Sequence, residues 1–277
     1  MNMKKHDHQY LKDVCKKRRL ELIELLHKFQ TGHPGGSLSA VEIITLLYYE
    51  TMDVEKIKRK ESDRDRFILG KGHAAPVLYL TLADLGFFPK SDMETFRQIG
   101  SNLQGHPCAD KTQGVEVSTG PLGLGLSAGV GIALSAKMDK LDYTTYVLMG
   151  DGELQEGIIW ESAMAAAKYN LGNLVAIVDH NGVQLDGTLE EVMPLGNLCD
   201  KWRSFGWEVF SAKGHDLMSL SEALDNAKKS RGKPSVIIAD TVKGKGVSFM
   251  EGKKQWHGRQ IDGSSYKKAI EELEAKV

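Results

Sequence analysis

The sequence has few cysteines, no surplus of charge of one sign and no long apolar run, and each absence excludes a class of protein. Three cysteines, an odd number with no close pair, indicate neither a disulfide framework nor a CxxC metal site and fit a reducing cytoplasm. With 36 Lys and Arg against 37 Asp and Glu, the chain lacks the basic excess that would favour nucleic acid. No run approaches the roughly 18 apolar residues of a membrane span, so we expect no membrane partner.

The N-terminal residues are charged and lack the apolar core of a signal peptide, so we expect the protein to stay in the cytoplasm. Their basic cluster, Lys16 to Arg19, matches the pattern of a targeting or nucleic-acid patch. Because the cluster precedes the apolar run LELIELL, we interpret it as the charged outer face of one amphipathic helix.

Short runs rich in Val and Ile alternate with helix-like stretches through the second half of the sequence. The runs typical of strands cover residues 146–150, 174–179, 207–210 and 235–240. The stretches at 156–170 and 217–232 are long enough for crossover helices. This alternation predicts an α/β fold, with a mainly parallel sheet and helices on both faces.

The first third of the sequence is dominated by helical segments. The expected order is a helix at 9–29, a turn at GHPGGS, a helix at 39–50, a polar connection ending in FILG and a helix from about Ala74. A short C-terminal helix is expected at 264–275. No repeat or Gly/Ser linker divides the chain, so we expect residues 1–277 to form a single domain.

The 29 glycines gather at the junctions between the expected elements. Their clusters are GHPGG, GKGH, GPLGLG, GDG and KGKG. A turn explains any one cluster, because glycine readily adopts positive φ. Four of the five contain or adjoin a His, an acid or a Lys, which indicates that the backbone approaches a polar ligand.

Asp151 and Asn181 follow two successive expected strands, one strand-helix-strand crossover apart. If these strands are parallel neighbours, both side chains face one crevice at the carboxyl edge of the sheet. Carboxylate, amide and phosphate oxygens select Mg²⁺ or Ca²⁺ over zinc, which predicts a metal-bound diphosphate. The alternative is structural: Asp151 caps a helix, and Asn181 occupies a left-handed turn in Asn-Gly.

Other nucleotide-binding motifs fit less well. GKGHAAP lacks the spacing and the Ser or Thr of a P-loop. GLGLSAGVG follows STGPLG rather than a Val/Ile strand, so the context of a dinucleotide-binding fold is missing, and NAD binding is the less favoured alternative.

Eight blocks, in order along the chain, resemble the N-terminal, diphosphate-binding domain of a transketolase. They are TGHPGGSLSAVEIITLLYYE, RDRFILGKGHAAPVLYL, LQGHP, STGPLGLGLSAGVGIAL, GDGELQEGIIWES, VDHNGVQLDG, TVKGKGVSF and WHG. Their combination is far more specific than GDG alone. GHPGG followed by AVEI, with the late WHG, favours transketolase over deoxyxylulose-phosphate synthase and over the α chain of a 2-oxoacid dehydrogenase.

The resemblance implies that the chain binds thiamine diphosphate through Mg²⁺, for which Ca²⁺ or Mn²⁺ could substitute. The metal ligands that it implies are Asp151, Asn181 and the carbonyl of Val183. The cofactor contacts that it implies are Gly152, His73 and His257 at the diphosphate, Gly120, Pro121, Leu122 and Gly123 near the rings, and also Asn181 and Glu156.

The resemblance also implies roles for histidines and glutamates. The histidines matching the substrate side of the site, where they would be catalytic, are His33, His73, His106 and His257. Imidazoles that titrate near pH 7 suit proton transfer on sugar hydroxyls. His106, in the short block LQGHP, fits a turn histidine equally well. Glu156 and Glu161 resemble glutamates that link paired sites at the interface between catalytic partners.

The chain departs from the family in length, because complete transketolases continue into a pyrimidine-binding domain with a cofactor-activating glutamate and sugar-phosphate ligands. We therefore expect a split enzyme, completed by a C-terminal transketolase subunit in an α2β2 heterotetramer. A decayed half and a non-catalytic, regulatory scaffold are the alternatives. The expected reaction transfers a two-carbon ketol unit from a ketose phosphate to an aldose phosphate, with pentose-phosphate sugars as the default substrates.

One helix is a candidate for the subunit interface. Beside Glu156 and Glu161, its apolar residues are more numerous than a solvated face needs. These residues are Ile158, Ile159, Trp160 and Met164. The alternative buries Ile159 and Trp160 in the core of the chain itself.

Overall fold

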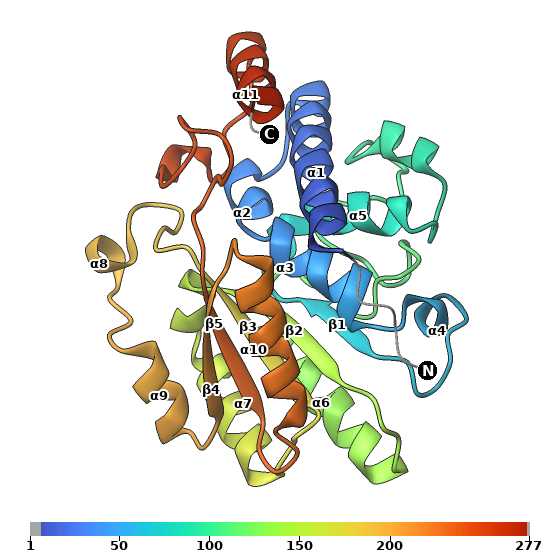
Figure 1. The fold of residues 1–277 in the computed structure, drawn as a ribbon, viewed down its shortest axis with the longest axis vertical. Coiled ribbons are helices and arrows are strands. Elements are labelled where there is room, and N and C mark those ends of the chain that lie inside the picture. The colour runs from blue at the N-terminus through green and yellow to red at the C-terminus, as the bar shows by residue number, and fades with distance from the viewer. Residues whose placement is uncertain (1–6, 276–277) are drawn as a thin grey trace.

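Five strands form a parallel sheet at the centre of the computed structural model, which describes residues 7–275 (Figure 1). The strands are β1 (Arg66–Leu69), β2 (Thr145–Gly150), β3 (Leu174–His180), β4 (Glu208–Lys213) and β5 (Ser235–Asp240). They lie in the order β1-β2-β3-β5-β4, and every neighbouring pair is parallel, which confirms the predicted α/β fold. Residues 1–6 lie outside the described residues, and the expectation that the N-terminal segment is not a signal peptide falls partly on them.

Helices cover both faces of the sheet, as predicted. They are α1 (His8–Phe29), α2 (Pro34–Ser39), α3 (Val41–Leu46), α4 (Val54–Lys58), α5 (Ala75–Asp84), α6 (Leu124–Asp139), α7 (Gly157–Lys168), α8 (Leu189–Val192), α9 (Leu198–Ser204), α10 (Leu217–Lys229) and α11 (Gly263–Ala275). In β2, Tyr146 and Leu148 face one apolar core, while Val147 and Met149 face the other. Figure 1 shows α10 in front of the sheet and α6 and α7 behind it. None of the described helices is long and apolar enough to cross a membrane.

The first third of the chain differs from the prediction in three places. The apolar end of the expected polar connection is the edge strand β1, which pairs with β2. GHPGGS, expected to be a turn, contains α2, because Pro34 occupies the first helical position, where its fixed φ suits a helix. The helix expected at 39–50 is α3 followed by a π-helical turn at Leu47–Thr51.

The basic cluster of α1 does not lie wholly on an outer face, and the expectation is wrong for two of its four residues. Only 1% of Arg18 and 7% of Arg19 are exposed to solvent. Arg18 forms ion pairs with Glu21 and Asp84, and Arg19 forms one with Glu42. Burial is tolerated because each guanidinium finds a carboxylate inside the structure.

The apolar residues of α7 have two different environments. Ile159 is fully buried, and Trp160 packs against Trp202 and Phe205 with ring centroids 5.2 and 5.1 Å apart. The core of the chain itself therefore accounts for Ile159 and Trp160, as the alternative interpretation held. Glu156, Glu161 and Met164 are exposed, as the interface interpretation requires.

The carboxyl ends of the strands bring the glycine clusters together at one edge of the sheet. Gly150 at the end of β2 lies beside Asp179 of β3 in the strand register, so the GDG and VDHNG segments leave the sheet as neighbours. A Cβ added to Gly125 would lie 2.7 Å from the Cα of Gly70. The GPLGLG and GKGH segments thus approach backbone to backbone, which requires glycine at this position.

Candidate active site

Asp151 lies directly after β2, next to the turn that follows β3, and we refer to this junction of two strand ends as the crevice. One carboxylate oxygen, Oδ1, accepts a hydrogen bond from the Gly152 N–H (2.8 Å), which is the helix-cap role of the structural alternative. The other oxygen, Oδ2, accepts from the Gly182 N–H (2.6 Å), beyond the end of the neighbouring strand. Asp151 therefore joins the two strand ends as well as capping its own turn.

The turn after β3 holds the other two oxygens that the sequence assigns to a metal. Asn181 Oδ1 accepts a hydrogen bond from the Val183 N–H (3.1 Å), and the positive φ of the Asn-Gly pair, +75°, belongs to Gly182. The carbonyl of Val183 accepts from Lys243 Nζ (2.9 Å). The Val183 carbonyl thus already faces a cation in the crevice.

A buried ion pair that the sequence analysis did not identify lies beneath the crevice. Lys71 of the GKGH segment pairs with Asp179 of β3, and both side chains are almost completely buried. Asp179 also accepts hydrogen bonds from Ser39 Oγ (2.6 Å) and from Thr241 Oγ1. Burial works against the charge of Asp179, but Lys71 and these hydroxyls outweigh it and hold the pKa of Asp179 below its ordinary value. The network joins three segments to one carboxylate of β3: the GKGH loop, α2 and the residues that follow β5.

Glu153, also absent from the predicted site, attaches the GPLG segment to the sheet. Its Oε1 accepts from the Gly123 N–H (2.9 Å) and its Oε2 from the Gly150 N–H (3.1 Å). Gly123 has a φ of +86°, and a Cβ there would lie 2.6 Å from the Cγ2 of Ile158, so glycine is required. Gly120, Pro121 and Leu122 precede this anchor as the half-exposed or exposed part of the loop.

Three of the four predicted histidines form a cluster. The ring centroids of His33 and His73 are 5.2 Å apart, those of His33 and His257 5.4 Å, and those of His73 and His257 5.1 Å. Lys243 Nζ donates to His257 Nδ1 (3.1 Å), so the neutral ring carries its proton on Nε2. Lys243 therefore contacts both the histidine cluster and the turn after β3, which links the two parts of the site.

His106 stands at the margin of this cluster. Its side chain is exposed, and a Cβ added to Gly120 would lie 3.4 Å from its Cγ, so it borders the GPLG loop. Arg97 lies close enough that its charge lowers the pKa values of both His33 and His106, after the larger effect of burial. Arg97 is a further residue of the crevice that the sequence analysis did not identify.

Comparison with known proteins identifies the family of the chain. The family described as "Transketolase, thiamine diphosphate binding domain" matches residues 11–274. The chain belongs to the transketolase family.

Two curated relatives are similar over nearly their whole length. One subunit of the apulose-4-phosphate transketolase of Phocaeicola vulgatus is 45% identical over 94% of this chain and 92% of its own. The 6-deoxy-6-sulfo-D-fructose transketolase subunit SqwG of Clostridium sp. is 42% identical over 99% of this chain and 98% of its own. The solved transketolase of Campylobacter jejuni matches with a TM-score of 0.89 and 33% identity, over 97% of this chain and 43% of that one.

The three clustered histidines of this transketolase-family chain have lowered pKa values. Burial, followed by the charge of Arg97, lowers the pKa of His33 to about 4, and burial, followed by Lys243, lowers that of His257 to about 3. Burial and then Lys71 lower the pKa of His73 well below its ordinary value. Near pH 7 the three rings are therefore neutral, and each can donate one hydrogen bond and accept another.

The depressed histidine pKa values predict a stability that falls in mild acid. Below about pH 6.5 the unfolded chain takes up protons that the folded His33 and His257 do not bind until pH 4 or lower, so acid favours unfolding. Urea unfolding measures the drop in the free energy of unfolding between pH 7 and pH 5. This drop should be smaller in His33→Asn than in the native chain, by about 1 kcal/mol after allowance for solvent screening. Identical losses in the variant and the native chain would contradict the assignment.

The residues at the strand ends fit a divalent cation shared with a diphosphate. Asp151 is 2% exposed, and its carboxylate is held by two backbone N–H groups and by no ion pair among residues 7–275. Burial and then the charge of Asp179 raise its pKa, a penalty that a bound cation would relieve. Within the described residues no group of three His, Cys, Asp or Glu side chains could hold a metal ion.

Proposed function

We propose that this chain is the thiamine diphosphate-binding subunit of a two-chain transketolase, which transfers a two-carbon ketol unit from a ketose phosphate to an aldose phosphate. The observation that carries the proposal is the position of Lys243, which joins the histidine cluster to the oxygens of the Asp151 and Val183 crevice. A metal-diphosphate crevice and a group of neutral proton donors and acceptors therefore form one site. The curated relatives described as transketolase subunits support the two-chain form.

The crevice would hold the cofactor by its diphosphate end. Asp151, Asn181 and the carbonyl of Val183 would hold Mg²⁺ as hard oxygen ligands. The Asn181 amide oxygen, which accepts one hydrogen bond, has a second lone pair available. Burial, and then the charge of Lys71, lower the pKa of Lys243 to about 8, so at pH 7 it remains a cation suited to a phosphate oxygen.

The histidine cluster would transfer protons to and from the oxygens of the sugars. When bound, thiamine diphosphate supplies the centre that stabilises the two-carbon carbanion equivalent. His257, with its proton on Nε2, and the neutral rings of His33 and His73 would donate to and accept from the hydroxyl and carbonyl oxygens of the sugars. Because all three rings are partly withdrawn from water, each remains neutral across the physiological pH range.

The substrate we propose is a sugar that bears an anionic group. Arg97, near His33 and His106, gives this side of the site a positive charge. The names of the two relatives refer to a sugar phosphate and to a sulfonated sugar, and both substrates carry such an anion. Pentose phosphates are therefore only one group among the donors to be tested.

The partner surface that we propose includes the exposed side of α7. Met164 is 56% exposed, and Leu124, at the start of the neighbouring α6, is 45% exposed. Glu156 and Glu161 lie on the same exposed segment. A C-terminal subunit docked here would complete the site in an α2β2 assembly, the arrangement expected of closed two-fold symmetry.

Reconstitution with the C-terminal subunit tests the proposal. Calorimetry should detect thiamine diphosphate binding that depends on Mg²⁺, and a coupled assay should detect ketol transfer only as the partner is added. The donor panel should include pentose phosphates, apulose 4-phosphate and 6-deoxy-6-sulfo-D-fructose. Full activity of the chain alone would contradict the two-chain form, and cofactor binding without transfer by the assembled pair would favour a regulatory scaffold.

A further inference from the structure

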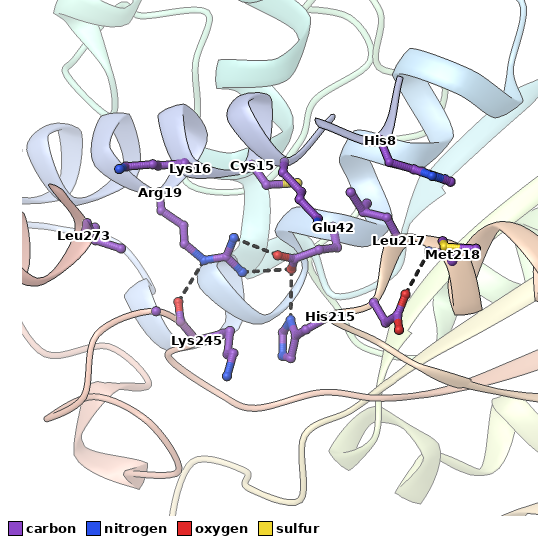
Figure 2. A pocket seen from close by; sticks show the side chains of 13 residues that line it. His8, Cys15, Lys16, Arg19, Glu42, His215, Leu217, Met218, Lys245 and Leu273 are labelled. Carbon is purple, nitrogen blue, oxygen red and sulfur yellow. Dashed lines mark hydrogen bonds and ion pairs between the residues drawn. The ribbon is translucent and has the colours of Figure 1, made fainter. Parts of the chain in front are cut away.

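A cavity lies away from the crevice, between α1, the loop before α10 and the segment after β5. Its volume is about 710 Å³. Figure 2 shows Glu42 at its centre, with Arg19 of α1 on one side and His215 on the other. Arg19 belongs to the basic cluster of α1, whose burial the sequence analysis did not anticipate.

The three central side chains form one continuous network. Arg19 binds Glu42 through two nitrogens, with Nη1 to Oε1 at 2.7 Å and Nη2 to Oε2 at 2.8 Å. Glu42 Oε2 also lies 2.9 Å from His215 Nδ1. Burial works against the charge of Glu42, but Arg19 and His215 outweigh it and lower its pKa to about 2. The carboxylate is thus ionised and fully engaged.

Both ends of the network form hydrogen bonds with the backbone that follows β5. The Val242 N–H donates to His215 Nε2 (2.8 Å), and Arg19 Nε donates to the carbonyl of Lys245 (3.0 Å). Since Nε2 accepts, the single proton of a neutral His215 lies on Nδ1 and is donated to Glu42. A ring protonated on both nitrogens would place an N–H against the Val242 N–H and could not make this bond.

The segment 241–246 therefore has two faces. Toward the crevice, Thr241 donates to Asp179, and Lys243 donates to Val183 and His257. Toward the cavity, the Val242 N–H and the Lys245 carbonyl are held by His215 and Arg19. Lys243 lies between Val242 and Lys245, so a shift of either cavity-side bond would move it.

We propose that Arg19, Glu42 and His215 are positioning residues for the active site, which set Lys243 against the crevice from the opposite side of the segment 241–246. The inference rests on the proposed function only for the identity of the ligand that Lys243 would contact. The position of the segment 241–246 follows from its hydrogen bonds to Arg19 and His215. His215 is the informative member, because it joins the charged pair to the backbone one residue before Lys243.

His215→Phe tests the proposal by keeping the ring and removing both hydrogen bonds. In the full chain, hydrogen exchange of the amides at 242–246 should accelerate by about tenfold or more, while the amides of β2 and β3 keep their protection. Calorimetry with thiamine diphosphate and Mg²⁺, on the chain assembled with the C-terminal subunit, should give about 10-fold weaker binding, the usual loss when a supporting partner is removed. His215→Gln, whose amide oxygen can accept from Val242, should recover part of both effects.

His8→Phe is the matched control, because His8 lines the same cavity outside the network. It should leave exchange and affinity unchanged. Accelerated exchange at 242–246 with unchanged affinity would overturn the positioning role, as would unchanged exchange in His215→Phe. If the native chain assembled with the C-terminal subunit binds no cofactor, the proposed function fails, while the exchange measurement still decides whether His215 holds the segment. Loss of protection throughout His215→Phe, without recovery in His215→Gln, would indicate a purely structural role and also overturn the proposal.

Discussion

Asp151→Asn should weaken Mg²⁺-dependent binding of thiamine diphosphate by more than about 100-fold, because it removes the only anionic side chain proposed as a ligand of the metal. The change keeps the shape of the side chain, and its amide oxygen can still accept from one of the two backbone N–H groups of Gly152 and Gly182. Because burial and Asp179 raise the pKa of Asp151, loss of the charge relieves an unfavourable interaction that offsets the lost hydrogen bond, and the metal-free chain should remain folded. Calorimetry and thermal unfolding with and without Mg²⁺ measure the two effects separately.

Asp240→Asn provides the matched control for this experiment. Asp240 also ends a strand, at the carboxyl edge of β5, but its side chain is 71% exposed and pairs only with His180 among the described residues. Its substitution should leave cofactor affinity unchanged. Equal affinities of Asp151→Asn and the native chain would contradict the metal assignment, whereas a collapse of the metal-free Asp151→Asn chain would show that the carboxylate is structural.

The part of the site that the sequence predicts is the part governed by strand ends. Asp151 and Asn181 follow apolar runs, and the carboxyl ends of parallel neighbours meet by geometry. The Lys71–Asp179 pair joins residues 108 positions apart, and no local pattern indicates which charged side chains meet beneath a crevice. Asp179 nevertheless offered a signal, because it is a charged residue at the end of a run that is otherwise apolar.

Elements whose partners lie elsewhere in the chain were the harder ones to predict. β1 is only four residues long, and its strand identity depends on pairing with β2. Arg18 and Arg19 lie on the apolar stripe of α1, one turn before Leu22 and Ile23, so the helical spacing indicates their burial. The carboxylates from other segments that pair with both arginines leave no local signal in the sequence. Local periodicity identified α1 itself, because an apolar stripe along a helix needs no knowledge of its partner.

Lys243 shows the same limit within the site. The sequence places it in the KGKG cluster, where glycines indicate an approaching ligand, but its contacts with Val183 and His257 join three separate loops. Its importance could be inferred only after those loops were assembled on the sheet. The glycine clusters thus locate the crevice, and long-range contacts determine which side chains act in it.

His257→Asn should lower the turnover of the assembled enzyme by about 10²–10⁴-fold, because it removes one proton donor and acceptor from the cluster. Asparagine can still accept from Lys243 Nζ, the partner of His257 Nδ1, so the cation should keep its place. Cofactor affinity should therefore change by less than about 10-fold, since the lost interaction is one that His257 would make with the sugars in the transition state.

Single-turnover and steady-state assays of the assembled enzyme, with calorimetry on the same preparation, separate the two effects of His257→Asn. His8→Asn serves as the control. It makes the same substitution at the cavity between α1 and the loop before α10, and it removes a histidine that the proposed reaction does not use. Native turnover in His257→Asn would place His257 outside the reaction. A large loss of cofactor affinity at unchanged turnover would instead assign His257 to the diphosphate, beside Lys243, and would leave proton transfer to His33 and His73.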